Sequence, residues 1–282
     1  MVPLNAKKTT IKAVTFDLWN TLLFESDDAS ATRAATRAKN VAEALHGLGL
    51  NASVDQVTSA VNKTINSLLR TWGQNKDVTH VDQLHMLVGH AFDGKVIFRE
   101  EWISRLSSAY ISPIYEVPPY INPDTHEVLR WLKDHDKHIG LICNTGITPG
   151  FSLRKILTRE SIAQYFDAMT FSDEVGIRKP DPKIFRLTTH KLKAKPSETV
   201  HVGDNLRADV WGAKGAGLKA IHLDTMEGKD KTALSDPTSM VSRSANLGTQ
   251  KTTPRVPDKT IAKLQMLPTA LAELNSAKPL RP

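Results

Sequence analysis

The chain has 282 residues, of which 40% are hydrophobic and 24% charged, and its net charge is +7 at pH 7. These fractions are typical of a globular protein and exclude collagen-like, fibrous and wholly disordered chains. The single cysteine, Cys143, excludes an internal disulfide and a multi-cysteine zinc site. No apolar run approaches the ~20 residues that span a bilayer, and residues 1–10 lack the apolar centre of a secretory signal. We therefore expect a cytoplasmic protein.

The positive charge does not predict a nucleic-acid partner. Much of the excess lies in residues 228–282, and the longest basic run is the pair Lys7-Lys8. No basic stripe alternates with aromatic side chains, as a nucleic-acid surface would favour. We interpret the charge as a solvated surface. We expect neither nucleic acid nor membrane as a partner, and a chain that is a monomer or a homodimer.

The first half of the chain predicts one strand followed by helices. Residues 11–16 are apolar and read as a short buried strand. Apolar side chains then recur at helical spacing in four stretches, at residues 29–48, 54–69, 81–92 and 102–110. Three prolines, Pro113, Pro118 and Pro119, indicate a hinge after this helical segment.

After the hinge, helical and strand patterns alternate. Helices are predicted at residues 125–133, 151–157, 182–192 and 208–214, and strands at 138–143, 168–171, 199–202 and 218–223. Asp181 is placed to cap the third of these helices, with Pro182 at its first position. Residues 229–255 are polar and read as a flexible loop, whereas residues 261–274 return to apolar spacing and close the core.

This order predicts an α/β fold, a doubly wound parallel sheet interrupted after its first strand by an all-helical insert. We expect residues 8–24 and 119–282 to form the α/β core and residues 25–118 to form the helical cap.

Four polar segments follow predicted strands: residues 16–22, 141–146, 172–182 and 202–209. Open parallel sheets place their ligand sites at this edge. There, Asp17, Asp204 and Asp209 can converge with one ammonium group, that of Lys179. Buried carboxylates are costly unless they are paired or bound to metal. Three carboxylates beside a lysine suit a hard divalent cation such as Mg²⁺.

Taken together, these segments resemble the haloacid dehalogenase-like (HAD) hydrolase superfamily, in the subfamily with a helical cap. Residues 17–22 resemble its D-x-x-x-T-L nucleophile motif, residues 172–182 its lysine motif and residues 203–209 its G-D-x-x-x-x-D motif. One motif alone would be weak. All of them in order, each at a strand end, leave little room for chance. The resemblance extends from Val14 to about Leu223.

The resemblance implies covalent catalysis. Asp17 would attack the electrophilic centre of the substrate, and water would then hydrolyse the aspartyl intermediate. Lys179 would neutralise the nucleophile and hold the transferring group, while the Thr21 hydroxyl would orient the nucleophile loop. The alternative for Asp17 and Lys179 is an ordinary buried ion pair.

The same resemblance implies Mg²⁺ as the cofactor. Asp17, Asp204 and the backbone carbonyl of Trp19 would bind the ion, and Asp209 would support it directly or through another ligand. For Asp209 the alternative is a helix cap, a common use of aspartate at a helix start.

The sequence departs from the family at Trp19, where phosphatases usually carry a second aspartate that protonates the leaving oxygen. An indole only donates a hydrogen bond, and the missing acid–base help is typically worth about 10²–10⁴ in rate. The substrate could have a leaving group that needs no proton, a cap residue could supply the acid, or the site could bind without turnover. The dehalogenase branch also has an aromatic residue here, but it lacks the G-D pair and does without Mg²⁺.

A second departure is Cys143, where the family usually has Ser or Thr as a hydrogen-bond donor to the substrate. A thiol is a weak donor, so Asn144, Thr145 and backbone N–H groups of this turn could bind the substrate instead. The alternative for Cys143 is a small buried hydrophobic residue at a strand end.

In the helical segment, Arg33 and Arg37 lie one turn apart and could hold an anionic substrate. We favour a solvated helix face for both. His80, His85 and His90 have no metal-ligand spacing. The remaining candidates, His201, Trp72 and Trp102, are interpreted as core side chains.

The function that these residues favour is a Mg²⁺-dependent phosphatase for a small, anionic, phosphorylated metabolite with a good leaving group. The alternatives are a 2-haloacid dehalogenase-like hydrolase and a HAD-fold binding module with weak or no catalysis.

Overall fold

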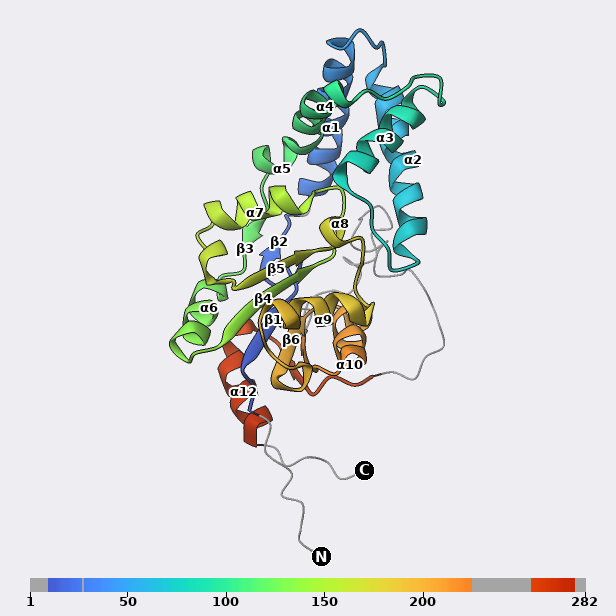
Figure 1. Cartoon of the computed structure of the whole chain (residues 1–282). Coiled ribbons are helices and arrows are strands. Elements are labelled where there is room, and N and C mark those ends of the chain that lie inside the picture. Colours follow the sequence, from blue (N-terminus) through green and yellow to red (C-terminus); the bar gives the residue numbers. More distant parts are fainter. Residues whose placement is uncertain (1–9, 27, 225–254, 277–282) are drawn as a thin grey trace, which may run out of the picture.

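The computed structural model describes residues 10–26, 28–224 and 255–276. Its main feature is a six-stranded sheet in which all neighbouring strands are parallel, in the order β5-β4-β1-β6-β7-β8 (Figure 1). The strands are β1 Ala13–Phe16, β4 His138–Cys143, β5 Ala168–Phe171, β6 Thr199–Gly203, β7 Lys219–Leu223 and β8 Lys259–Ile261. The predicted doubly wound α/β fold is confirmed.

Helices cover both faces of this sheet. Successive side chains of a strand point to opposite faces, so Val14 and Phe16 of β1 pack against one helical layer and Ala13 against the other. The first layer contains α6 Thr125–Asp134, α7 Gly150–Arg159 and α12 Leu267–Ser276. The second contains α9 Pro182–Lys191 and α10 Gly212–Ala216. Both strand faces are therefore buried, which explains why the strands read as continuous apolar runs.

A helical insert, defined here as residues 29–116, lies beyond one end of the sheet, on the side away from the helix α12 (Figure 1). Its helices are α1 Ala29–His46, α2 Val54–Trp72, α3 His80–Ala91, α4 Ile103–Ile111 and α5 Pro113–Glu116. Capping boxes of Ser53 with Gln56 and of Thr79 with Asp82 begin α2 and α3. The insert has its own apolar cluster, which includes Leu87 and Trp102. Trp102 is thus a core side chain, as predicted.

A short antiparallel ladder, β2 Leu23–Phe24 with β3 Tyr120–Ile121, joins the entry and the exit of the insert. Two-residue strands leave no periodic signal, so this ladder was not predicted. Pro113 begins α5 rather than breaking the chain, because proline fits the first position of a helix.

Two predictions at the end of the chain need correction. The helix expected at 208–214 begins earlier, as a π-helix over Leu206–Trp211 that continues into α10. Residues 259–261 form an edge strand before the terminal helix; no strand was predicted there, and apolar spacing was expected only from residue 261. The loop predicted at 229–255 lies, up to residue 254, outside the described residues.

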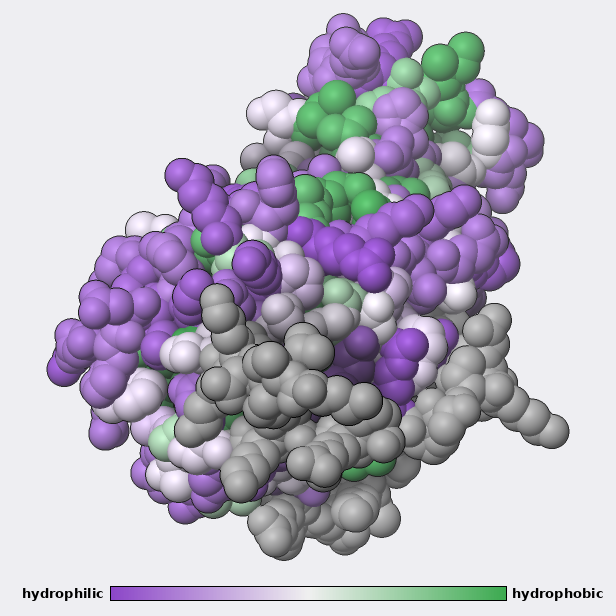
Figure 2. Space-filling model, turned by 60° about the horizontal axis from the view of Figure 1, so that its bottom comes forward, coloured by the Kyte–Doolittle hydropathy of each residue, from purple (hydrophilic) through white to green (hydrophobic). Residues whose placement is uncertain are grey.

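The face shown in Figure 2 is mainly hydrophilic, and its larger hydrophobic patches lie in the upper part of the view, over the insert. Val54 and Ile97 of the insert are exposed large hydrophobic residues. Among the described residues, no helix combines the length and the apolar character that crossing a bilayer requires.

Candidate active site

The candidate site lies where four strands of the sheet end, beneath the insert. Asp17, Asn144, Ser172 and Asp204 each come directly after the last residue of β1, β4, β5 and β6. Phe16 is in register with Leu141 on one side and Val202 on the other, so the ends of these three strands lie within two residues of one another along the sheet. A cavity of about 180 Å³ opens there, and both the sheet and the insert line it.

Asp17 lies at the floor of this cavity and is 7% exposed. One carboxylate oxygen contacts the Lys179 ammonium, and the other accepts a hydrogen bond of 3.4 Å from the Thr21 hydroxyl. Burial raises the pKa of Asp17 to about 6, an effect that Lys179 opposes and the nearby Asp209 carboxylate reinforces. Thr21 thus contacts the residue that its predicted role requires.

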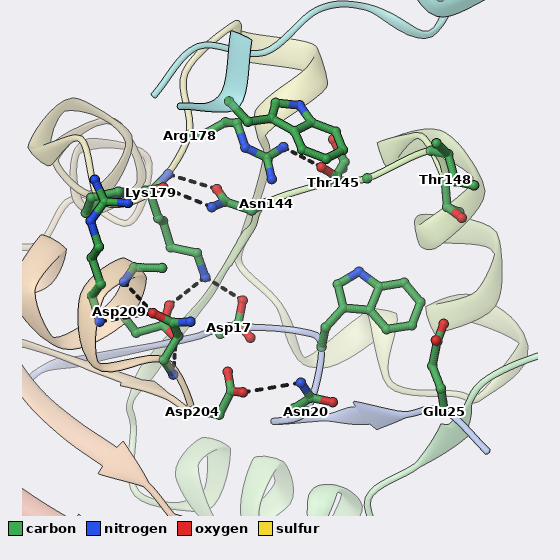
Figure 3. Close-up of a pocket in the computed structure, with 18 of the residues that line it drawn as sticks. Asp17, Asn20, Glu25, Asn144, Thr145, Thr148, Arg178, Lys179, Asp204 and Asp209 are labelled. Atoms are coloured by element: carbon green, nitrogen blue, oxygen red, sulfur yellow. Dashed lines mark hydrogen bonds and ion pairs between the residues drawn. The ribbon is translucent and has the colours of Figure 1, made fainter. Parts of the chain in front are cut away.

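Lys179 is buried, and its ammonium lies between two carboxylates. It contacts Asp17 and lies 2.8 Å from Asp209 Oδ1 (Figure 3). Burial alone would lower the pKa of Lys179, but the two carboxylates raise it overall, so the side chain is a permanent cation. The Asn144 amide fixes its backbone, with Oδ1 accepting from Lys179 N at 2.8 Å and Nδ2 donating to Lys179 O at 3.0 Å.

Both oxygens of Asp209 are engaged by the protein. Besides Lys179, Oδ1 lies 3.1 Å from His201 Nε2, and Oδ2 accepts from Asn205 N at 2.9 Å. His201 is fully buried, as predicted, and also contacts Thr15. A glycine is required at position 203, because an added Cβ would lie 2.4 Å from the Asp209 carboxylate. The lysine and the histidine lower the pKa of Asp209 despite its burial.

Asp204 completes a cluster of three carboxylates, in which one oxygen each of Asp17, Asp204 and Asp209 lies within 4.8 Å of the others. Burial, followed by the charges of Asp17 and Asp209, raises the pKa of Asp204 well above its usual range. Its hydrogen-bond partner is Asn20 Nδ2, at 3.3 Å. Asn20 adopts a positive φ of 58°, a conformation that asparagine tolerates better than most residues. Oxygen ligands gathered in this way suit a hard cation of the Mg²⁺ type.

The insert supplies two arginines to the cavity wall, and our interpretation of them as a solvated face was wrong. Arg33 is 5% exposed; it contacts Glu25 and donates to Val117 O at 3.0 Å. Arg37 is 3% exposed; its Nε donates to Tyr110 O at 2.8 Å, and its guanidinium lies over the Tyr110 ring. The cavity therefore has cationic groups on both its floor and its roof.

Of the other residues predicted to bind the substrate, some line the cavity and one lies in the apolar core. Trp19, Asn144 and Thr145 line the cavity. Cys143 does not: it is fully buried in the main apolar cluster, so the structure gives it the alternative role of a small core residue. Burial raises the pKa of its thiol.

Of the aromatic and histidine candidates, Trp72 is buried as predicted. It lies against Arg178 and the cavity, however, rather than in the apolar cluster of the insert. His80 packs between Tyr110 and Phe151. Among the residues that the structure describes, no histidine joins a metal-binding group.

Sequence reasoning missed a buried ion pair beside this site. Asp77, from the connector between α2 and α3, binds Arg178, the residue before Lys179. The two are 101 positions apart, so nothing local in the sequence indicates the pair. Glu25 on the cavity wall was also missed.

The comparisons with known proteins agree with this fold and site. The sequence model of the haloacid dehalogenase-like hydrolases matches residues 11–217, and the chain therefore belongs to that family of hydrolases. Glyceraldehyde 3-phosphate phosphatase of Methanopyrus kandleri is 27% identical over 215 residues, which are 76% of this chain and 84% of that protein.

Two solved structures show the same fold. The 2-haloacid dehalogenase from Pseudomonas syringae has a TM-score of 0.65 at 23% identity, covering 94% of this chain and 99% of that one. A HAD phosphatase from Thermococcus onnurineus has a TM-score of 0.56 at 24% identity, covering 93% and 98%. The fold is therefore shared by phosphatases and dehalogenases, and the choice between them depends on the side chains at the site.

Proposed function

We propose that this hydrolase is a Mg²⁺-dependent phosphatase that acts on a small phosphorylated metabolite with a good leaving group. The observation that carries the proposal is the carboxylate cluster of Asp17, Asp204 and Asp209 beside the buried ammonium group of Lys179. The relative from Methanopyrus kandleri supports the same function, because it is a phosphatase of glyceraldehyde 3-phosphate, a small phosphorylated metabolite.

The residues present fit a magnesium ion. Asp204, Asp17 and the backbone carbonyl of Trp19 would hold it, since no lysine or arginine of the described residues forms an ion pair with Asp204 and its charged form is disfavoured without a cation. Asp209 would act indirectly, because both of its oxygens already accept contacts from Lys179, His201 and Asn205. When bound, Mg²⁺ neutralises charge on the phosphoryl oxygens and so favours attack by an anionic nucleophile.

In this mechanism, an Asp17 oxygen attacks the phosphorus atom. The new O–P bond forms as the bond to the leaving oxygen breaks, which gives an aspartyl phosphate and releases the leaving group as its anion. Water then attacks that phosphorus, releases phosphate and restores the carboxylate. Lys179 stabilises the negative charge that the transferring group carries, and Asn144 holds the lysine in position.

The choice of leaving group follows from the residues near Asp17. Trp19 has no proton to exchange at neutral pH. Among the described residues, the one carboxyl group on the cavity wall outside the cluster is Glu25, and Arg33 binds it. The Glu25 carboxylate is thus already engaged in an ion pair within the wall. Acyl phosphates, anhydrides and other substrates with acidic leaving groups therefore suit this site.

The roof of the cavity favours a substrate that is anionic beyond its transferring phosphoryl group. Arg37 is buried against neutral groups, and no carboxylate of the described residues lies within ion-pair distance of it. We propose that residues 25–118 act as a cap that selects the substrate through this arginine. We also propose a cytoplasmic location, where such metabolites occur, and a monomer or homodimer.

The test is hydrolysis of acetyl phosphate and p-nitrophenyl phosphate with Mg²⁺ or with chelator. We expect turnover that chelator removes, and an Asp17→Asn variant reduced by roughly 10⁴-fold or more. In the wild-type enzyme quenched during turnover, mass spectrometry should find phosphate on Asp17. Turnover that persists in chelator would contradict the proposal.

The second candidate is a 2-haloacid dehalogenase, which Trp19 and the likeness to the Pseudomonas syringae enzyme favour. It predicts halide release from 2-chloropropionate in chelator, with no phosphate release under any condition. A third outcome, binding of orthovanadate without turnover of either substrate class, would favour a binding module.

A further inference from the structure

The connector between α2 and α3, residues 73–79, joins the insert to the segment that carries Lys179. Asp77 N donates to Gly176 O at 3.2 Å, and Arg178 N donates to Asn75 O at 2.9 Å. Lys76 and Ile177 form an isolated antiparallel bridge between these bonds. The backbone of the insert is therefore hydrogen-bonded to the backbone of the core over residues 176–178, directly before Lys179.

The Asp77 side chain anchors this junction in the interior. Its Oδ2 accepts hydrogen bonds from Arg178 Nη1 and from Ser172 Oγ, each at 2.5 Å. Its Oδ1 accepts from Trp72 Nε1 and from the backbone N of the next residue, Val78, each at 2.9 Å. The Asp77 side chain is 0% exposed. The Thr145 hydroxyl also donates to Oδ2, at 3.4 Å, so a residue of the insert is the acceptor for three polar groups of the core.

Arg178 depends on this carboxylate. Its side chain is 4% exposed, it donates also to Thr145 O, and its guanidinium lies 4.3 Å from the centre of the Trp72 ring. Within the described residues, Asp77 is the acid that forms an ion pair with it. Removing one partner of a buried ion pair leaves an uncompensated charge that drives the other to move.

Movement of Arg178 would reach Lys179, because the two residues are adjacent in the chain. The Lys179 segment has two lateral supports: the Asn144 amide from the core and the Asp77–Asn75 connector from the insert. Figure 3 shows Arg178, Lys179 and Asn144 side by side above Asp17. Displacement of a reacting group by about 1 Å can lower the rate ~10²-fold.

We propose that Asp77 is a positioning residue for the hydrolytic centre: through Arg178, the insert fixes the ammonium of Lys179 against Asp17. The inference rests on the proposed role of Lys179 in the hydrolase reaction. If Asp77 only attached the insert to the core, its substitution would lower stability without a specific loss of turnover. The positioning role and the purely structural role therefore predict different kcat values.

The test is Asp77→Asn. An asparagine has one acceptor oxygen, so its NH₂ group would face either Arg178 and Ser172 or Trp72 and the Val78 amide, all of which are donors. We expect kcat to fall roughly tenfold to a hundredfold, while KM changes less than about twofold. The probes are acetyl phosphate with Mg²⁺ for rates and thermal unfolding for stability.

The matched control is Leu87→Ala. Leu87 is fully buried in the apolar cluster of the insert, in the helix that follows the connector. It should lower the unfolding temperature as Asp77→Asn does, but keep kcat within about twofold of wild type. Equal kcat values for the two variants would overturn the proposal. If Asp77→Asn fails to fold, Arg178→Lys replaces it, since a lysine keeps the charge without the fork of donors, and the same outcomes apply.

Hydrogen exchange separates failure of this inference from failure of the proposed function. In wild type the amides of Asp77 and Arg178 are hydrogen-bonded, and their exchange should accelerate at least tenfold in Asp77→Asn but not in Leu87→Ala. If no substrate is turned over, this acceleration still supports the coupling of Asp77 to the Lys179 segment. Unchanged exchange would overturn it.

Discussion

Replacing Asp204 with asparagine should stabilise the metal-free protein and abolish its response to Mg²⁺. Asp204 lies within 4.8 Å of both Asp17 and Asp209. At an effective dielectric constant of about 20, each like-charge pair at that separation repels by about 3.5 kcal/mol. Protonation of Asp204, relaxation and solvent relieve most of this, so we expect a gain of about 1–3 kcal/mol in the free energy of unfolding. The Asn20 hydrogen bond can persist, because asparagine retains one acceptor.

The assay is thermal unfolding in chelator and in excess Mg²⁺. In chelator, Asp204→Asn should unfold several degrees above wild type, since a domain of this size gains roughly 2–4 °C per kcal/mol. In wild type, Mg²⁺ at a hundred times its Kd should add about 2.7 kcal/mol, and in the variant nothing. The control is Asp181→Asn, an N-cap where asparagine serves equally well, which should change neither value.

The stability difference between Asp204→Asn and wild type should depend on pH, in a direction that the pKa of Asp204 determines. Folding raises the pKa of Asp204, so the wild-type protein in chelator loses stability as pH rises above the ordinary aspartate pKa of 3.8. The advantage of Asp204→Asn should therefore grow with pH in that direction. A variant less stable than wild type in chelator at neutral pH, or one that Mg²⁺ still stabilises, would refute the reasoning.

Three further substitutions test other parts of the site. Trp19→Asp should raise kcat/KM for an alkyl phosphate by roughly 10²-fold and much less for p-nitrophenyl phosphate; equal gains would mean that Trp19 does not occupy the place of a proton donor. Arg37→Gln should raise KM for an anionic substrate by roughly tenfold or more, as loss of a charged hydrogen bond implies, with kcat nearly unchanged; an unchanged KM would remove Arg37 from substrate binding. Gly203→Ala should lower both activity and unfolding temperature, because its Cβ would overlap Asp209, whereas Gly89→Ala, with nothing within 4 Å, should lower neither.

The sheet and the floor of the site could be predicted because their signals are local. Each strand is a short apolar run that ends in a polar residue, and parallel strands bring their carboxyl ends to one edge. Asp17, Asn144 and Asp204 need no further information to be placed together. The helix that begins at Pro182 could be predicted equally well from Asp181 and Pro182. In the structure Asp181 caps this helix by accepting a hydrogen bond from Lys183 N.

The roof could not be predicted, because its contacts come from distant segments. Arg33 and Arg37 are charged side chains on a predicted helix, and arginine side chains are mostly exposed in folded proteins. Their burial depends on Val117 O and Tyr110 O, which are 84 and 73 positions away. The burial of Asp77 could not be predicted for the same reason. A charged residue in a connector is expected to be exposed to solvent unless its distant partner is known.

The charge balance of the floor explains why the carboxylate cluster favours phosphoryl transfer over dehalogenation. When all three are ionised, Asp17, Asp204 and Asp209 bring three negative charges, and Lys179 compensates one of them. A divalent cation would neutralise the rest, and a phosphoryl group could then approach an anionic nucleophile. A haloacid carries one carboxylate and its carbon centre needs no such neutralisation, so Asp204 would only destabilise a site built for it. The aromatic side chain of Trp19 is compatible with either reaction, whereas the Asp204 carboxylate favours phosphoryl transfer.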